Sequence, residues 1–188
     1  MGKLIVSEFV SIDGVMEAPG GEEGYKHSGW VFDFSDKKQE KYKLTETLDA
    51  EALLLGRVTY EGFAGAWPQR SGEFADKMNS MPKHVVSTTG PDLTWEGSEL
   101  LGPDVAKEVR RLKQEDGGPL LVAGSGTLVA TLLQDGLVDE LRLMVFPVVL
   151  GSGRRLFPDS PDTIVLRLAG TQAFDTGVVV QTYRSVPA

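Results

Sequence analysis

The chain has no cysteine and only two histidines, His27 and His84. Without cysteine there can be no disulfide, no thiolate nucleophile and no cysteine-based zinc site. Neither histidine lies in an HxxxH or HExxH pattern, so we expect no metal ion. The sequence also contains no GxSxG nucleophile elbow and no GxxxxGK[ST] phosphate loop. These absences argue against the commonest metal-dependent, serine-hydrolase and nucleotide-hydrolysing classes, although Ser125 after a strand leaves a serine nucleophile as a weak alternative.

Long apolar runs and excess positive charge are missing as well. No run reaches the roughly 18 apolar residues that a membrane span needs. The first residues, MGKLIVSEFVSIDGVM, are interrupted by Ser7, Glu8 and Ser11, which predicts a strand rather than a signal peptide. The net charge of -8 disfavours nucleic acid and anionic lipid as partners. We therefore expect a cytoplasmic protein with a small-molecule partner, no nucleic acid and no membrane.

The length and composition predict one globular domain over residues 1–188. The chain is 41% hydrophobic and 24% charged, which is an ordinary balance for a folded protein. Strands are expected at 3–10, 52–55, 83–88, 93–95, 120–123, 140–149, 163–174 and 178–185. Helices are expected from 35 or 36 to about 48, from 58, around 72–79, from Pro103 to 113, and from 126 to about 136.

The order of these elements predicts the fold class. Helices connect most of the strands, which favours parallel pairing. The last two strands are joined by the turn Asp175-Thr176-Gly177, which predicts an antiparallel hairpin. The expected fold is a three-layer α/β sandwich around a mixed, mostly parallel sheet. Pro147 suggests an edge or a bulge in the strand at 140–149.

Two predicted strands end in glycine and lead directly into helices. They read ALLLG followed by RVTYEGF, and LLVAG followed by SGTLVATLL. Glycine lets the backbone approach a phosphate, and the free amides of the next helical turn can bind its oxygens. Arg57 adds a guanidinium beside the first turn. Two such turns at the carboxyl edge of one sheet could bind one dinucleotide, although tight turning alone also explains each glycine.

An ordinary Rossmann dinucleotide reductase is the weaker interpretation. The third glycine of GxGxxG is replaced by Val129, and no acidic residue follows the first strand at the expected distance. The predicted C-terminal hairpin also argues against it.

The sequence resembles dihydrofolate reductase and, more closely, the reductase domain of the bifunctional riboflavin-biosynthesis deaminase/reductase. Five segments carry the resemblance over nearly the whole chain: VSIDGVM, LLLGRVTYEGF, KHVVSTT, VAGSGTLV and VDELRLMVFPVVLGSGRRLF. It implies a dihydrofolate-reductase-like fold and an NADPH cleft along the strand ends. It also implies a reductase of a small heterocycle, such as 5-amino-6-(5-phosphoribosylamino)uracil, and a homodimer.

The resemblance also implies particular site residues. The pyrophosphate and adenosine side would be formed by Gly56, Arg57, Val58 and Thr59, with Arg57 at the 2′-phosphate. Ser87 and Thr88 would donate hydrogen bonds from their hydroxyl groups to that phosphate. The helix start that carries the pyrophosphate would be Gly124, Ser125, Gly126, Thr127 and Leu128. Ile12, Asp13 and Gly14 would border the nicotinamide. Dihydrofolate reductase has two adjacent glycines, often joined by a cis bond, where this chain has Gly124-Ser125.

Several assignments stay open at this point. Asp13 is a candidate polar anchor or proton relay, or it forms an Asx turn with Gly14. Trp30 and Trp67 could line a pocket for a flat ring, although core packing is the default for tryptophan. The segment LRLMVFPVVL could pack against a second copy, or it could be central. The alternative function is a non-catalytic module that binds a flat heterocycle or drug.

Overall fold

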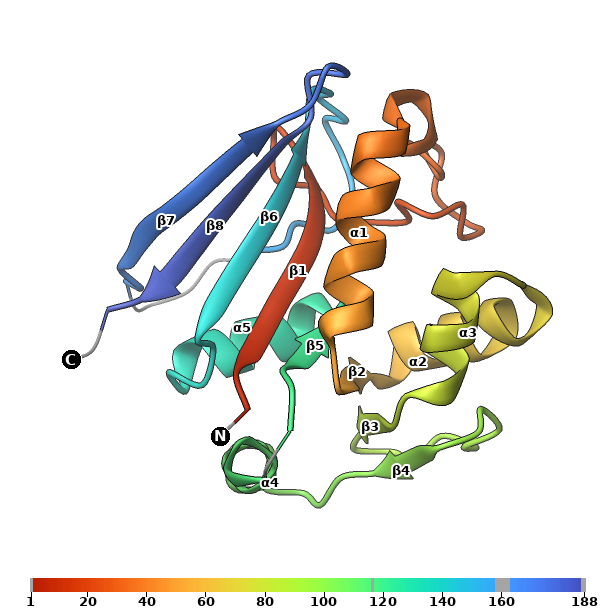
Figure 1. Ribbon diagram of the computed structural model, residues 1–188, viewed down its shortest axis with the longest axis vertical. Helices are drawn as coiled ribbons and strands as arrows, with labels where there is room; N and C mark the ends of the chain where they lie inside the picture. The colour runs from red at the N-terminus through yellow and green to blue at the C-terminus, as the bar shows by residue number, and fades with distance from the viewer. Residues whose placement is uncertain (1, 116, 158–162, 187–188) are drawn as a thin grey trace.

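The computed structural model describes residues 2–115, 117–157 and 163–186. The strands of this part form one sheet in the order β4-β3-β2-β5-β1-β6-β8-β7 (Figure 1). Its strands are β1 (Leu4–Ser11), β2 (Ala52–Gly56), β3 (Lys83–Val86), β4 (Ser98–Leu100), β5 (Leu120–Val122), β6 (Glu140–Phe146), β7 (Leu166–Ala173) and β8 (Val179–Ser185). Its α-helices are α1 (Lys37–Asp49), α2 (Arg57–Ala66), α3 (Glu73–Ser80), α4 (Val105–Gln114) and α5 (Gly126–Gln134). Two 3₁₀ turns, η1 (Phe32–Phe34) and η2 (Trp67–Gln69), complete the list.

The predicted fold class is confirmed. All pairs from β4 across to β6 are parallel, whereas β6 with β8 and β7 with β8 are antiparallel. The hairpin turn lies between β7 and β8 as expected, and Gly177 has φ +86° there. Helices occupy both faces of the sheet, as Figure 1 shows for α1 in front of it and α5 behind.

The alternation of strand side chains explains the two helical layers. Leu4, Val6 and Leu54 face α4 and α5 and form one core cluster with them. Ile5 and Leu53 point the other way and pack under α2 and α3. The strands between the layers are therefore apolar on both sides, which is typical of parallel sheets covered by helices.

Three local predictions were wrong. No strand forms at 93–95, because Trp95 is buried and its amide donates to the Tyr60 hydroxyl at 3.0 Å; the short strand is β4 instead. Pro103 precedes helix α4 rather than starting it, since the N-cap is Asp104, whose carboxylate accepts from the Lys107 amide at 3.0 Å. The strand before Pro147 is neither an edge nor bulged, because β6 lies between β1 and β8.

Strand β1 extends further toward the carboxyl edge of the sheet than its neighbour β5. The two pair only from Leu4 to Val6, and β5 ends at Val122. β1 continues beside β6 up to Ser11. Beyond Val6 the β5 side of β1 therefore has no strand partner, and the turn that starts α5 lies there.

A buried lysine provides a test of this fold. Lys83 is fully buried at the start of β3, where its ammonium donates to the carbonyls of Asn79 and Glu96 at 2.5 and 2.9 Å and lies 4.3 Å from the Trp95 ring centroid. Burial lowers the pKa of Lys83 from 10.5 to about 8. Between these two pH values the unfolded chain binds the extra proton, so stability must rise with pH.

We expect Lys83→Met to remove this pH dependence. From pH 8 to 10.5 the free energy of unfolding of the wild type should rise relative to the variant by up to about 3 kcal/mol. Urea unfolding at several pH values measures the difference, with the exposed Lys107→Met as the control. Parallel curves for wild type and Lys83→Met would show that Lys83 keeps its ordinary pKa.

Candidate functional site

The two glycine turns meet at the carboxyl edge of the sheet. The Gly56 amide at the end of β2 donates to the Ser125 hydroxyl at 2.8 Å, although the residues are 69 positions apart. A Cβ added at Gly56 would lie 3.3 Å from the Ser125 side chain. A Cβ at Gly124 would lie 2.9 Å from the Thr59 methyl group. The starts of α2 and α5 are therefore in direct contact.

The turn before α5 leaves backbone amides free to bind an anion. Gly124 and Ser125 both have positive φ, +71° and +66°. The Ser125 side chain makes no cap bond to its own helix, because its hydroxyl accepts from Gly56. The first amides of an α-helix, here those of Gly126, Thr127 and Leu128, have no intrahelical partner and lie at the positive end of its dipole. Such a helix start favours a phosphate.

This turn is built without the cis bond seen in many dihydrofolate reductases. No cis peptide occurs in the described part of the chain. Two successive left-handed residues turn the chain instead. A non-glycine residue in this conformation is strained, and at Ser125 the hydrogen bond to Gly56 compensates for the strain.

The residues expected at the 2′-phosphate lie at neighbouring strand ends. Gly56 pairs with Val86, so Arg57 and Ser87 each follow directly after a paired position. The Arg57 guanidinium is half-exposed and bonds both oxygens of Glu61, at 3.0 and 3.1 Å. The Ser87 hydroxyl accepts from the amides of Thr89 and Gly90. Val58 and Thr88 are exposed beside them.

Asp13 ties two loops together. Its carboxylate accepts from the Ser11 hydroxyl at 2.6 Å and from the amides of Leu150 and Gly151 at 3.1 and 2.9 Å. The Ser11 hydrogen bond, together with the two amides, lowers the pKa of Asp13 to about 2. Asp13 is thus ionised at neutral pH and accepts hydrogen bonds, which favours the polar anchor over the proton relay. Arg155 donates to the Asp13 carbonyl.

Of the residues predicted at the nicotinamide and the substrate, Ile12 and Gly14 lie in a loop and Trp30 lies in the core. Ile12 is exposed, with its amide bonded to the Val148 carbonyl at 2.9 Å, and Gly14 turns the chain at φ +80°. Trp30 is 6% exposed and packs edge-on against Phe146, with its indole N–H on the Glu17 carbonyl. Its contacts are those of a core residue.

Trp67 lies at a different place. Its ring stacks on Phe74 with a centroid distance of 5.1 Å, and Arg70 lies 4.6 Å above it. Its carbonyl accepts from Asn79, shortly before β3 begins. These contacts place Trp67 near the amino end of β3 and do not bring it to Gly56 and Ser125.

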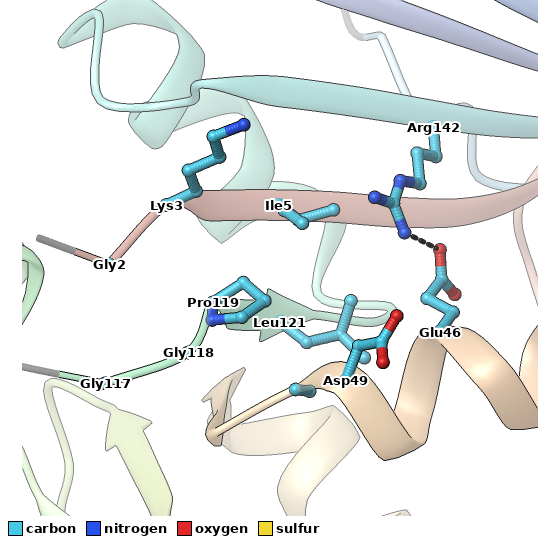
Figure 2. A pocket seen from close by; sticks show the side chains of 11 residues that line it. Gly2, Lys3, Ile5, Glu46, Asp49, Gly117, Gly118, Pro119, Leu121 and Arg142 are labelled. Carbon is cyan, nitrogen blue, oxygen red and sulfur yellow. Dashed lines mark hydrogen bonds and ion pairs between the residues drawn. The ribbon is translucent and has the colours of Figure 1, made fainter.

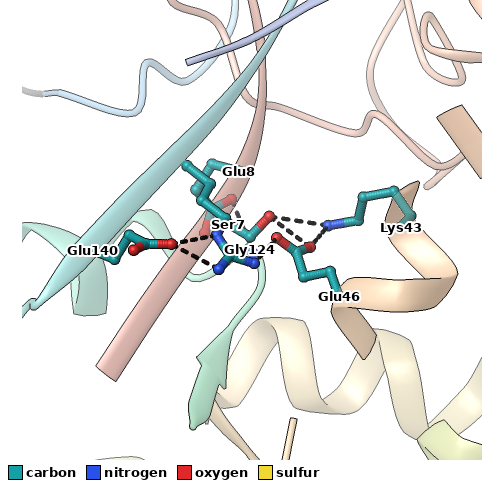
Figure 3. A network of polar contacts seen from close by, with 7 residues as sticks. Ser7, Glu8, Lys43, Glu46, Gly124 and Glu140 are labelled. Atoms are coloured by element: carbon teal, nitrogen blue, oxygen red, sulfur yellow. Dashed lines mark hydrogen bonds and ion pairs between the residues drawn. The ribbon is translucent and has the colours of Figure 1, made fainter. Parts of the chain in front are cut away.

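Sequence reasoning missed Glu8. This residue lies where β1 is still paired with β6 but no longer with β5. It is 3% exposed and accepts from the Gly124 amide at 3.0 Å (Figure 3). Burial raises the pKa of Glu8 well above its ordinary value. The available signal was a charged residue inside a strand whose neighbours are all apolar or small.

A second polar cluster lies on the α1 face of the sheet. Glu46 of α1 bonds Ser7, Lys43 and Arg142, and Arg142 also bonds Glu140 (Figure 3). Although burial opposes ionisation, Lys43 and these other partners lower the pKa of Glu46.

The cluster borders a cavity of about 340 Å³ near the amino ends of β1 and β5, where Lys3 and Asp49 also lie (Figure 2). This cavity is at the opposite edge of the sheet from the glycine turns. Its buried charges already have partners.

Within the described residues, no group of three histidine, aspartate or glutamate side chains could hold a metal ion. In the same part of the chain, none of the helices has the length and apolar character required to cross a membrane.

Comparison with known proteins decides the family. The profile of the RibD C-terminal domain matches residues 2–180. The chain belongs to the RibD C-terminal domain family. Two Bacillus subtilis (strain 168) relatives, the uncharacterized proteins YyaP and YwjB, are 27% and 30% identical to it. The YyaP match covers 96% of this chain and 94% of YyaP, and the YwjB match covers 97% and 98%. The resemblance found in the sequence is thereby confirmed.

Two solved structures show the same fold. A Shewanella sp. PV-4 protein provisionally assigned to riboflavin biosynthesis has a TM-score of 0.77 at 18% identity, with all of both chains covered. Dihydrofolate reductase from Enterococcus faecalis, complexed with NADP(H) and RAB-propyl, has a TM-score of 0.63 at 16% identity, covering 98% of this chain and 96% of the other.

The contact between the two turns can be tested with two alanine substitutions. Gly124→Ala forces a left-handed alanine and places its Cβ against Thr59, whereas Gly136→Ala forces the same conformation, at φ +63°, into open space. Backbone strain should destabilise both variants by about 1–2 kcal/mol. The clash should add a further ~1–3 kcal/mol at Gly124 alone.

Chemical unfolding of both variants measures this difference. Adding Thr59→Ala to Gly124→Ala should recover part of the extra loss, because the methyl group that clashes is removed. Equal destabilisation of the two single variants would mean that the starts of α2 and α5 are not in contact.

Proposed function

We propose that this protein is an NADPH-dependent reductase of a small heterocyclic substrate, of the 5-amino-6-(5-phosphoribosylamino)uracil type. One observation carries the proposal: the hydrogen bond from Gly56 to Ser125 joins two helix starts at the carboxyl edge of the sheet. Ligands of open α/β sheets bind at that edge. Membership of the RibD C-terminal domain family supports the reaction class, and the NADP(H) named for the Enterococcus enzyme supports the cofactor.

The residues present fit a dinucleotide. Free amides at the start of α5 suit a diphosphate. The glycines at the second turn are closely packed: a Cβ at Gly124 would lie 2.9 Å from the Thr59 methyl group, and a Cβ at Gly126 would lie 2.6 Å from the Met16 sulfur. We assign Arg57, Ser87 and Thr88 to the 2′-phosphate, Gly56, Val58 and Thr59 to the adenosine side, and Gly124, Ser125, Gly126, Thr127 and Leu128 to the pyrophosphate. Ile12, Asp13 and Gly14 border the nicotinamide.

A bound nicotinamide would supply hydride to a C=N or C=O carbon, and the protein supplies position and exclusion of water. Asp13 acts through the loops: its ionised carboxylate fixes residues 150 and 151 beside the turn at Gly14. Since it is ionised and accepts three hydrogen bonds, the proton that follows the hydride comes from another donor. Trp30 and Trp67 remain candidates for a substrate pocket, but only the sequence pattern supports them.

The second candidate is a non-catalytic module that binds a flat heterocycle. The hydrogen bonds to Asp13 favour this module, because they stabilise the carboxylate and leave it no proton to donate to a substrate. The discriminating experiment offers NADPH with the pyrimidinone ribosyl phosphate and with dihydrofolate, and follows NADPH absorbance. Oxidation with either substrate supports the reductase, and tight NADPH binding without oxidation of either supports the module.

The cytoplasmic location and the homodimer also stay predictions. The apolar segment LRLMVFPVVL no longer supports a dimer, since β6 is internal. The exposed edge strand of the described sheet at the C-terminal end is β7.

Arg57→Gln tests the cofactor assignment. Removing the guanidinium should weaken NADPH binding by about ten- to a hundredfold, the usual effect of a lost charged hydrogen bond, and should leave NADH binding nearly unchanged. Fluorescence titration measures both affinities. Arg70→Gln, which removes an arginine over Trp67, is the matched control. An equal loss for NADPH and NADH would place Arg57 elsewhere on the dinucleotide.

A further inference from the structure

Glu8 is a buried carboxyl group at the start of α5. It is the second β1 residue beyond the last pair with β5. One oxygen, Oε2, accepts from the Gly124 amide at 3.0 Å (Figure 3). The other, Oε1, is buried and has no hydrogen-bond partner among the described residues. An unpaired buried polar atom is costly, so one at a candidate site requires an explanation.

The position of Glu8 conflicts with anion binding if its carboxyl group is ionised. The amides that would bind a diphosphate follow Gly124 directly in the chain. A carboxylate there would repel the phosphate oxygens, with little water between them to screen the charges. A neutral carboxyl group has no such effect, and its hydroxyl can donate to an acceptor.

We propose that Glu8 is a positioning residue that holds the Gly124 turn through Oε2 and is neutral whenever a diphosphate lies at the start of α5. The protonated oxygen, Oε1, is then a donor for which the described residues supply no acceptor. Each binding event above the pKa of the free protein takes up one proton at Glu8. The proposal rests on the proposed function only in its choice of a diphosphate ligand.

The surroundings of Glu8 favour the neutral form. Neither β5 nor α5 contains a titratable side chain, and its register partner on β6 is Leu143. The charged groups that act on it are Lys43 and Glu46 of α1, on the other face of the sheet, and they act in opposite directions. Burial outweighs both and raises the pKa of Glu8.

The test compares wild type with Glu8→Gln, which keeps an acceptor for Gly124 but carries no charge. The probe is ADP-ribose, a diphosphate without nicotinamide. Its dissociation constant is measured by calorimetry between about pH 5 and pH 9 in two buffers of different ionisation enthalpy. For the wild type we expect weakening that approaches tenfold per pH unit above the pKa of Glu8, with uptake of one proton. Glu8→Gln should show neither effect.

Two further variants separate this role from a purely structural one. Glu8→Leu leaves the Gly124 amide without an acceptor, and at every pH should have a lower melting temperature and a lower affinity than the equally uncharged Glu8→Gln. Glu108→Gln removes one surface charge on α4 and should keep the wild-type pH profile. Identical pH profiles for wild type and Glu8→Gln would overturn the proposal.

The outcomes also separate this inference from the reductase assignment. If ADP-ribose binds with the Glu8-dependent profile but no substrate oxidises NADPH, the reductase proposal fails and the role of Glu8 stands. If neither ADP-ribose nor NADPH binds to any variant at any pH, both fail.

Discussion

The contact between the ends of β2 and β5 is the constraint on which the candidate site depends. A backbone amide and a serine hydroxyl from distant parts of the chain bond there, and Gly124 lies against Thr59. Glycine suits both sides of this contact, because a Cβ at Gly124 would lie 2.9 Å from the Thr59 methyl group and a Cβ at Gly56 would lie 3.3 Å from the Ser125 side chain. The Ser125 hydroxyl makes no cap bond to its own helix, so the first amides of α5 remain available to a ligand.

Strand β5 ends earlier than β1, and this leaves space beside β1 for the turn at Gly124. Since β1 continues beyond β5, the sheet is interrupted between β1 and β5, and the turn at Gly124 lies in that interruption. Glu8 closes it with a hydrogen bond in place of a strand pair. On the other side of the same edge, Asp13 connects the loop after β1 to residues 150 and 151. The two carboxyl groups, Glu8 and Asp13, have opposite environments: burial favours the neutral form of one, and hydrogen bonds favour the charged form of the other.

The fold was predictable because its signals are local. Most apolar strands, the helix start at Asp36 and the Asp175-Thr176-Gly177 turn depend on neighbouring residues. The turn lies as predicted, Asp36 is one of the two cap positions expected, and these strands form within the predicted ranges or one residue beyond them. The errors occurred where tertiary contacts override local preference. Tryptophan is common in strands, but hydrogen bonds from Trp95 to Tyr60 and Asn79 hold this residue outside the sheet. Taken alone, Pro147 suggests an edge strand. The strand that it follows, β6, is nevertheless internal, because β1 and β8 from distant parts of the chain pair with it on both sides.

The sequence by itself determined the order of strands and helices, the family and the two glycine turns, because glycine and apolar periodicity act over a few residues. Only the tertiary structure decided that these turns touch, that hydrogen bonds lower the pKa of Asp13 and that Glu8 bonds the turn at Gly124. The protonation of a carboxyl group depends on the water removed around it and on the donors that reach it. Those are contributed by residues more than a hundred positions away, such as Gly124 for Glu8 and Gly151 for Asp13.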